Sequence, residues 1–295
     1  METRGALAVR FEEQRPQLRG MAYRMLGSLS DAEDAVQEVW LRLDRQPDVE
    51  IRNLGGWLTT VTGRVCLDQL RARAARGEQP LTDPLPDPVV TEWDEADPEH
   101  EALVADSVGL ALMVVLDTLT PAERVAFVLH DVFGVPFDGI SGILARTEPT
   151  TRKLASRARA KVQDHAAVPD ADLSTQRTVV EAFLAAARDG DLPRLVAVLA
   201  PDVIARADWG PATGARRVVQ GSAAVASEAV RFARLGPDAR VAIVNGAAGI
   251  LVGPPARPMT VLAFTVQNGT VVEIDIFADQ DRLTRLLSDP KDAGG

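Results

Sequence analysis

Residues 77–100 interrupt the chain with a stretch that cannot contribute a hydrophobic face. The sequence there is rich in proline and acid (PLTDPLPDPVVTEWDEADPEHE) and shows no apolar period. From Thr82 to Glu101 it carries eight carboxylates and neither lysine nor arginine. Proline prevents regular hydrogen bonding and like charges repel, so such a stretch favours a linker. The sequence therefore predicts a linker between one helical block that ends near residue 76 and another that begins near residue 101.

The composition is that of a globular protein with ample core material. The length of 295 residues predicts two or three domains, and the hydrophobic fraction is 46%. No run of about 18 apolar residues and no apolar signal segment occurs, which predicts a cytoplasmic protein with no membrane partner. Cys66 is the only cysteine and the three histidines are scattered, so we expect neither a disulfide nor a metal site, and no cofactor.

The net charge of −10 argues against nucleic-acid binding only if charge is averaged over the whole chain. Six cations face the single acid Glu148 in the segment 146–161. They are Arg146, Arg152, Lys153, Arg157, Arg159 and Lys161. Exposed charges are screened within about 10 Å at moderate salt, so the local charge governs contact with phosphate. This segment can therefore bind DNA.

A helix-turn-helix pattern surrounds the basic segment. A capping box at Thr120-Pro121-Ala122-Glu123 starts one helix, Gly134 ends it, and a short helix follows over Phe137 to about Ala145. Thr147 can cap a third helix, EPTTRKLASRARAKV, whose N-terminal half presents hydroxyls and cations. This geometry enters a DNA major groove. The alternative is a solvated basic face on an ordinary helix. The residues predicted to contact DNA are Arg146, Thr150, Thr151, Arg152, Lys153 and Arg157.

An acidic amphipathic helix is predicted near residue 35. We interpret Ser30-Asp31-Ala32-Glu33 as its capping box and DAEDAVQEVWLRL as its body, with one apolar stripe facing inward. The opposite face combines carboxylates with an exposed leucine, which suits a protein partner with a basic, partly apolar surface. A plain surface helix is the alternative. The face consists of Asp34, Gln37, Glu38 and Leu41.

These two strings resemble parts of one protein family. DAEDAVQEVWLRL resembles the polymerase-binding helix of region 2 in extracytoplasmic-function sigma factors (sigma-70 family, group 4), and LDTLTPAERVAFVLHDVFGVPFDGISGILARTEPTTRKLASRARAKV resembles their region 4. The resemblance covers residues from about 7 to 165. It implies two partners, promoter DNA and bacterial core RNA polymerase (β′ clamp helices and β flap), and no enzymatic activity. The implied polymerase contacts are Asp31, Asp34, Gln37, Glu38 and Leu41.

The segment IRNLGGWLTTVTGRVCLDQLRARAARG resembles the part of region 2 that opens and reads the minus-10 promoter element. Melted bases stack on flat side chains and pass through positive grooves, which this segment could supply. Core packing is the alternative for Trp57. The implied minus-10 contacts are Arg52, Asn53, Trp57, Thr60, Arg64 and Arg71, and the helix after Thr147 would bind the minus-35 element.

The C-terminal block changes character. The runs VAIVNG, TVLAFTVQ and TVVEIDIF favour strands, and Asn268-Gly269 predicts a type I′ hairpin turn. STQRTVVEAFLAAARDGDLPRLVAVLAPDVIARAD resembles SnoaL-like, ketosteroid-isomerase-like domains, which one group of these sigma factors carries fused at the end.

The expected fold is multidomain: two all-α sigma domains, the second a helix-turn-helix, followed by an α+β cone-shaped domain. The expected bounds are 1–76 for region 2, 77–100 for the linker, 101–166 for region 4, 167–173 for a short linker and 174–295 for the SnoaL-like domain.

Three short signatures of that group are partly kept. Leu85-Pro86-Asp87-Pro88 resembles a linker signature, Asp208-Trp209-Gly210-Pro211-Ala212 stands for Asp-Gly-Gly-Gly-Lys, and Asp279-Gln280-Asp281-Arg282-Leu283 stands for Asn-Pro-Asp-Lys-Leu. The resemblance implies that these positions regulate the sigma factor in cis. The candidate regulatory residues are Leu85, Pro86, Asp87, Pro88, Asp208, Gly210, Asp281 and Leu283.

Two other functions stay open for the whole chain. One is a ligand-responsive helix-turn-helix regulator, since a cone-shaped domain can hold a small molecule. The other is a SnoaL-like isomerase or cyclase fused to a DNA-binding half, with Asp208 or Asp275 as general base in a closed apolar pocket. From Ser174 onward the sequence has no His, Tyr or Cys, which argues against catalysis. We also hypothesise that Asp94, Glu95 and Asp97 of the acidic linker cover the DNA-binding surface when polymerase is absent.

Overall fold

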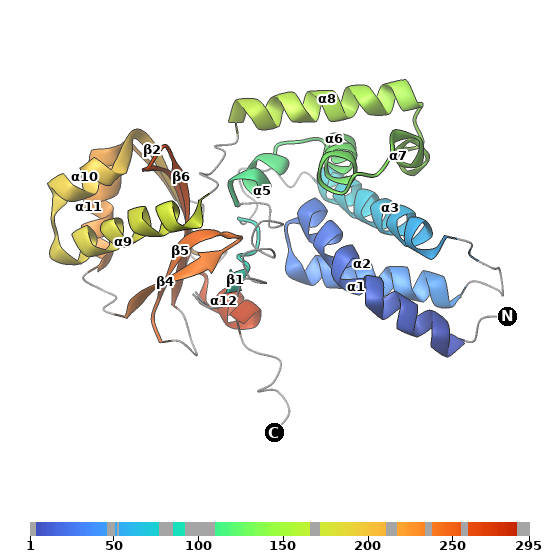
Figure 1. Ribbon diagram of the computed structural model, residues 1–295, viewed down its shortest axis with the longest axis horizontal. Helices are drawn as coiled ribbons and strands as arrows, with labels where there is room; N and C mark the ends of the chain where they lie inside the picture. Colours follow the sequence, from blue (N-terminus) through green and yellow to red (C-terminus); the bar gives the residue numbers. More distant parts are fainter. Residues whose placement is uncertain are drawn as a thin grey trace. The chain divides into compact units, whose positions relative to one another are not determined.

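The computed structural model divides the chain into two compact units (Figure 1). Unit 1 comprises residues 1–80 and 115–165, and unit 2 comprises residues 81–114 and 166–295. The structure describes residues 4–45, 51, 53–76, 85–91, 110–165, 172–210, 217–233, 238–254 and 259–287. No helix of this described part is long and apolar enough to cross a membrane.

Unit 1 is all-helical and contains both predicted sigma regions. Its elements are α1 (Arg4–Leu26), α2 (Leu29–Asp44), α3 (Leu54–Ala75), the last two residues of α5 (Leu110–Leu116, whose first five residues fall in unit 2), α6 (Pro121–Phe127), the π-helical turn η1 (Val128–Val132), α7 (Phe137–Leu144) and α8 (Glu148–His165). Helix α3 packs closely on the second region, because a Cβ at Gly63 would lie 3.1 Å from Ile143 of α7. The two sigma regions therefore share one core.

The cap of helix α2 differs from the sequence prediction. The capping residue is Ser28, whose hydroxyl accepts a hydrogen bond from the Asp31 amide at 3.2 Å, so Ser30 lies inside the helix. Gly27 has a positive φ of 76°, which ends α1 and leaves Ser28 in the extended conformation of an N-cap. The prediction of Ser30 as the cap was therefore wrong, although the buried stripe of Ala32, Ala35, Val36, Val39 and Leu43 is present.

Cys66 lies at the centre of unit 1 and should not react in the folded protein. The side chain is fully buried on α3, and burial raises the pKa of its thiol to about 12. Because the thiolate is the reactive species, alkylation by iodoacetamide at pH 8 should be more than about 10³-fold slower than in the unfolded chain. Mass spectrometry measures this rate, with the chain in guanidinium chloride as control. Rapid labelling of the native protein would contradict the packing of α3.

Unit 2 is an α+β domain built on one curved sheet. Its helices are α9 (Leu173–Asp189), α10 (Leu192–Val198), α11 (Ser222–Ala233) and α12 (Gln280–Leu287). Its strands are β1 (Val90–Thr91), β2 (Leu199–Asp208), β3 (Arg217–Gln220), β4 (Ala239–Val244), β5 (Ala247–Val252), β6 (Thr260–Gln267) and β7 (Thr270–Phe277), in the order β1-β4-β5-β6-β7-β2-β3. The neighbours are antiparallel except for β2 and β7. Helices α9 and α11 contribute Phe183 and Val225 to the core that the inner face of the sheet completes.

The hairpin turns follow local sequence. Asn268 and Gly269 both have positive φ, 52° and 73°, and join β6 to β7, which confirms the predicted type I′ turn. Asn245 and Gly246 adopt the same conformation between β4 and β5. The predicted strands TVLAFTVQ and TVVEIDIF correspond residue for residue to β6 and β7.

The proline-rich stretch contains a structured segment. Residues 85–91, here called the connecting segment, belong to unit 2, and their last two residues form β1, which pairs with β4 at Val90↔Val244. The sequence prediction of a linker did not include this strand. Local composition contained no strand signal, because the pairing partner lies more than 150 residues further along the chain.

Candidate functional site

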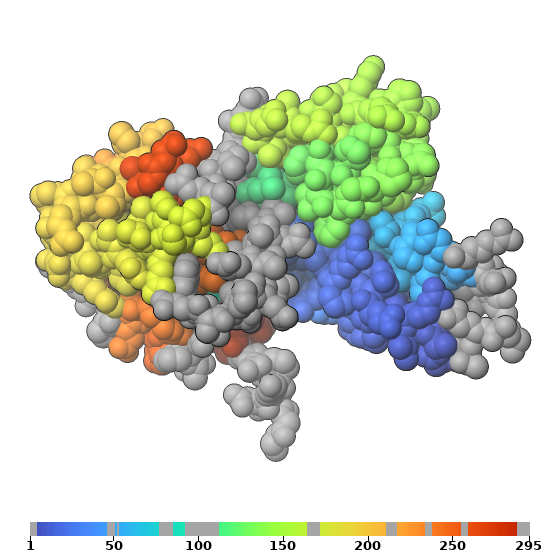
Figure 2. Space-filling model, viewed as in Figure 1, coloured from blue at the N-terminus to red at the C-terminus, as the bar shows by residue number. Residues whose placement is uncertain are grey.

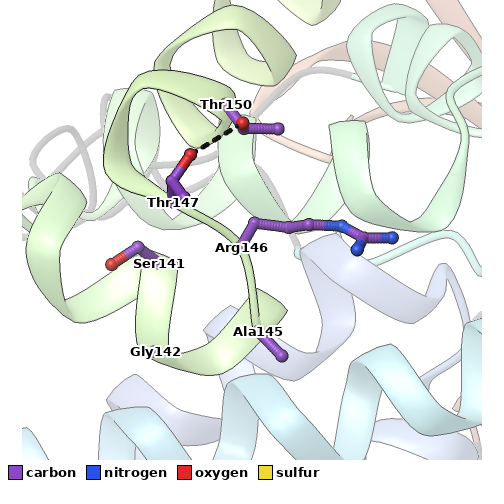
Figure 3. A pocket seen from close by; sticks show the side chains of 6 residues that line it. All are labelled: Ser141, Gly142, Ala145, Arg146, Thr147 and Thr150. Atoms are coloured by element: carbon purple, nitrogen blue, oxygen red, sulfur yellow. Dashed lines mark hydrogen bonds between the residues drawn. The ribbon is translucent and has the colours of Figure 1, made fainter.

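A tight turn joins the two helices of the helix-turn-helix, α7 and α8 (Figure 3). Ala145 ends α7 with a left-handed φ of 52°, and α8 begins after Thr147. The hydroxyls of Thr147 and Thr150 lie 2.8 Å apart, while Arg146 extends away from the turn. These residues line a hollow together with Ser141, Gly142 and Ala145.

The predicted DNA contacts divide into two groups. Arg146, Thr150, Lys153 and Arg157 are exposed, and no ion pair holds the three cations within the part of the chain that the structure describes. Arg152 is exposed as well, but it pairs with Glu148 and lies over the Phe137 ring at 4.7 Å. Thr151 is fully buried and donates to the Thr147 carbonyl oxygen at 3.2 Å, so we leave it out of the contact surface.

Two ion pairs fix the orientation of α8 against α6 and the turn η1. Lys161 donates to Glu123 at 2.9 Å, and Arg159 donates to Asp131 through two nitrogens. Burial by itself would raise the pKa of the Glu123 carboxyl, but hydrogen bonds from Lys161 and from the Thr120 cap outweigh it and lower the pKa. These pairs turn the basic face of α8 outward, and Figure 2 shows the helix in yellow-green on the surface of unit 1.

Helix α2 presents the predicted acidic face, but two of its carboxylates are paired with arginines of the same unit. Asp34 and Gln37 are exposed and Leu41 is 42% exposed, so these side chains can reach a partner. Glu38 is half-buried and forms an ion pair with Arg42. Asp31 is paired with Arg73 of α3, which also donates to the Leu26 carbonyl oxygen at 2.8 Å. Asp31 therefore stabilises the packing of α2 on α3.

The predicted minus-10 residues lie along α3. Asn53 caps the helix and accepts from the Gly56 amide at 3.0 Å, and Thr60 donates to the Gly56 carbonyl oxygen. Trp57 is half-buried and Arg71 is exposed. Arg64 is exposed and donates to the Gly142 carbonyl oxygen of α7 at 3.3 Å. Arg52 lies outside the described residues, as do Asp94, Glu95 and Asp97 of the acidic linker.

A cluster of charges in unit 2 holds the connecting segment. Arg282 of α12 donates to Asp87 at 2.7 Å, to Asp208 at 3.0 Å and to the Leu85 carbonyl oxygen. Asp208 in turn accepts from the Leu85 amide at 3.1 Å. We call these four residues the linker clasp. Their side chains are at most 12% exposed, so the guanidinium neutralises two carboxylates away from water.

Backbone hydrogen bonds continue the clasp along the connecting segment. The Val89 amide donates to the side-chain oxygen of Asn245 at 2.8 Å, and the Asn245 amide donates to the Val89 carbonyl oxygen at 2.8 Å. The strand pairing of β1 with β4 follows immediately. Pro86 and Pro88 are buried, and neither has an amide hydrogen that the sheet would need to satisfy. The segment is thus bound by both charge and backbone.

Gly210 holds the Asp208 side chain in the clasp through its backbone amide. Its amide donates to Asp208 at 3.0 Å, and its φ is 79°. A Cβ there would lie 2.5 Å from the Asp279 carboxylate, which caps α12 through the Arg282 amide at 3.1 Å. Only glycine fits this position without displacing the start of the helix that carries Arg282.

Sequence reasoning identified much of this cluster but not its centre. The structure brings together Leu85, Asp87, Asp208 and Gly210 and buries Leu283, whereas Asp281 is exposed. Arg282 and Asn245 were missed. A cation at position 282 stands where the family signature has lysine, and its charge complements the two predicted aspartates, which is the signal that could have identified it.

Neither candidate general base lines the cavity formed by the described residues of unit 2. Unit 2 has a cavity of about 510 Å³ whose wall includes Ala207, Ile274 and Ile276. Asp275 alternates with these isoleucines and points to the other face of the sheet, where it pairs with Arg206 at 3.2 Å. Asp208 belongs to the linker clasp. The two carboxylates therefore do not converge in the cavity, as the isomerase alternative required.

Known proteins resemble the chain along almost its whole length. The family model for sigma-70 region 2 matches residues 10–76, and that for sigma-70 region 4 matches residues 109–162. The ECF RNA polymerase sigma factor SigJ of Mycobacterium tuberculosis is 40% identical over 93% of this chain and 92% of its own. The probable ECF RNA polymerase sigma factor SigI of the same species is 33% identical over 93% and 94%.

A solved structure extends this similarity to the fold. The crystal structure of the Mycobacterium tuberculosis extracytoplasmic function sigma factor SigJ superposes with a TM-score of 0.71 at 35% identity. The superposition covers 94% of this chain and 98% of the SigJ chain. The similarity therefore includes the C-terminal domain as well as the two helical regions.

Proposed function

The chain belongs to the extracytoplasmic-function RNA polymerase sigma factors, and from that membership we propose that its C-terminal domain restrains it through the linker clasp. It is an alternative sigma factor, which directs core polymerase to specific promoters. We infer no catalysis by the C-terminal domain, since neither Asp208 nor Asp275 lines its cavity and Glu228 of the wall is paired with Arg217. The observation that carries the proposal is the contact of Arg282 with Leu85 and Asp87.

The packed form of unit 1 cannot read both promoter elements at once. Arg64 of α3 and Gly142 of α7 are 3.3 Å apart, so the two proposed DNA-reading regions touch. The minus-10 and minus-35 elements are separated by about 25 base pairs, or roughly 85 Å of B-DNA at about 3.4 Å per base pair. Regions 2 and 4 must therefore separate before both elements are bound.

The linker clasp opposes that separation. Residues 81–114 join the two parts of unit 1 in sequence, yet they belong to unit 2. While residues 85–91 stay bound to the sheet, less chain is available to span the distance between the promoter elements. Tethering also keeps the domain at a high effective concentration, so moderate contacts suffice. Promoter-specific transcription by core polymerase with the full chain should therefore rise when the clasp is broken.

Two further surfaces complete the proposal. The exposed cations of α8 contact the minus-35 element, with Arg reading guanine edges and the others binding phosphates. The exposed face of α2 binds the core polymerase, whose β′ clamp helices are the contact that the family resemblance implies. Both surfaces are expected to act in the cytoplasm, where polymerase and promoter meet.

Charge reversal on α2 tests the polymerase contact. The double variant Asp34→Lys/Leu41→Ser removes an exposed carboxylate and an exposed apolar side chain, so affinity for bacterial core polymerase should fall about 10- to 100-fold. Fluorescence anisotropy of the labelled full chain measures the affinity. The matched control is Glu13→Lys/Val9→Ser, which makes the same changes at exposed positions of α1. Equal affinity of the two variants would exclude the α2 face.

A further inference from the structure

The cavity of the C-terminal domain lies between the inner face of the sheet and helices α9 and α11. Its volume of about 510 Å³ falls within the range of pockets for small organic molecules, roughly 300–1,000 Å³. A ligand of matching shape gains dispersion contact with every apolar side chain of the wall. These side chains include Phe183, Ala205, Trp209, Ile250, Leu262 and Ile274.

The charged and amide side chains of the described wall are engaged with protein groups. Arg217 pairs with Glu228 at 2.8 Å. Arg188 donates to the Ala239 carbonyl oxygen, and Gln280 donates to the Met259 carbonyl oxygen. A charged ligand would break one of these interactions or bury its charge without a partner, at a cost of several kcal/mol. The wall therefore favours an uncharged, largely hydrocarbon molecule.

The cavity and the linker clasp share two short segments. Trp209 lines the cavity, and its neighbours Asp208 and Gly210 belong to the clasp and its support. Ala278 and Gln280 line the cavity, and Asp279 between them caps the helix of Arg282. The Ala278 amide also donates to the Asp208 carbonyl oxygen at 2.8 Å, which joins the two segments. Displacement of one wall residue therefore moves a clasp residue.

We propose that the cavity binds an uncharged, largely hydrocarbon ligand and that this ligand tightens the linker clasp. The sign follows from the structure, because the cavity is formed while the clasp is closed. A ligand shifts a conformational equilibrium toward the state that it binds better, here the closed clasp. The inference rests on the proposed restraint by the clasp and makes that restraint responsive to a small molecule.

Binding is tested with N-phenyl-1-naphthylamine, an uncharged aromatic fluorophore that brightens in apolar surroundings. The full chain should bind it saturably. Ala229→Phe fills the cavity from α11 and should weaken binding at least tenfold, whereas Ala224→Phe, exposed on the same helix, should not. Ala233→Leu is a smaller filling change if the first variant fails to fold. Binding that none of the filling variants weakens would overturn the cavity as the site.

Coupling is tested by hydrogen exchange of the connecting segment. Saturating probe should slow exchange of residues 85–91 at least about fivefold, the lower range of measured couplings. By reciprocity, Arg282→Ala should weaken probe binding by the same factor. Unchanged or faster exchange with bound probe would overturn the coupling, even where Arg282→Ala raises transcription and the clasp proposal stands. If Arg282→Ala leaves transcription unchanged while the probe still slows exchange, the proposed restraint fails and the ligand site remains.

Discussion

Replacement of Arg282 by alanine should detach the connecting segment from the C-terminal sheet and raise promoter-specific transcription several-fold. Arg282 is the cation between two buried carboxylates, Asp87 and Asp208. Removal of the guanidinium leaves the two carboxylates buried without the counter-charge of Arg282, at a cost of about 3–5 kcal/mol. That cost corresponds to a shift of roughly 10²-fold to several 10³-fold in the equilibrium between bound and detached segment.

Two measurements test this result. Hydrogen exchange of residues 85–91 should accelerate by about 10² or more, and run-off transcription with bacterial core polymerase should increase. Arg285→Ala is the matched control, since Arg285 lies on the same helix, is exposed and donates to the Asp281 carbonyl oxygen. Arg282→Lys should give an intermediate effect, because lysine keeps the charge but not the planar fork. Exchange at the wild-type rate in Arg282→Ala would contradict the role of the clasp.

Reversal of two charges on α8 should abolish promoter binding at physiological salt. Lys153 and Arg157 are exposed on the face that the structure turns outward. The double variant Lys153→Glu/Arg157→Glu removes two phosphate contacts and adds two repulsive charges. The affinity of the holoenzyme for promoter DNA should fall at least about 10²-fold, and the slope of log K against log salt should decrease by about 2.

The control variant changes the net charge by the same amount as the α8 double variant. Arg194→Glu/Arg285→Glu alters two exposed arginines of the C-terminal domain and should leave promoter affinity within about twofold of the wild type. If both double variants weaken binding equally, the effect comes from overall charge and α8 is not the reading helix. Filter binding over a range of salt concentrations distinguishes these outcomes.

The parts of the fold with local signals were predictable from sequence. The capping box at Thr120, the hairpin turn at Asn268-Gly269 and the short helix ending near Ala145 each depend on a few neighbouring residues. The Ser28 cap was missed because two serines, Ser28 and Ser30, compete for the same role, and the turn at Gly27 decides between them.

The centre of the regulatory cluster was not predictable in the same way. Arg282 and Asp87 are separated by 195 residues, and no local pattern indicates that they meet. Strand alternation placed Asp275 opposite Ile274 and Ile276, but it could not decide which face borders the cavity. That choice depends on where α9 and α11 pack, which is a property of the tertiary structure.

The interleaved order of the two units has a consequence for biosynthesis. Residues 1–80 and 115–165 leave the ribosome before residues 166–295, which provide the surface that holds the connecting segment. At about 5–20 residues per second, those 130 residues take roughly 6–26 s to synthesise. Each newly made molecule therefore passes through an interval in which all residues of its helical unit have been synthesised and the domain that we propose as its restraint has not.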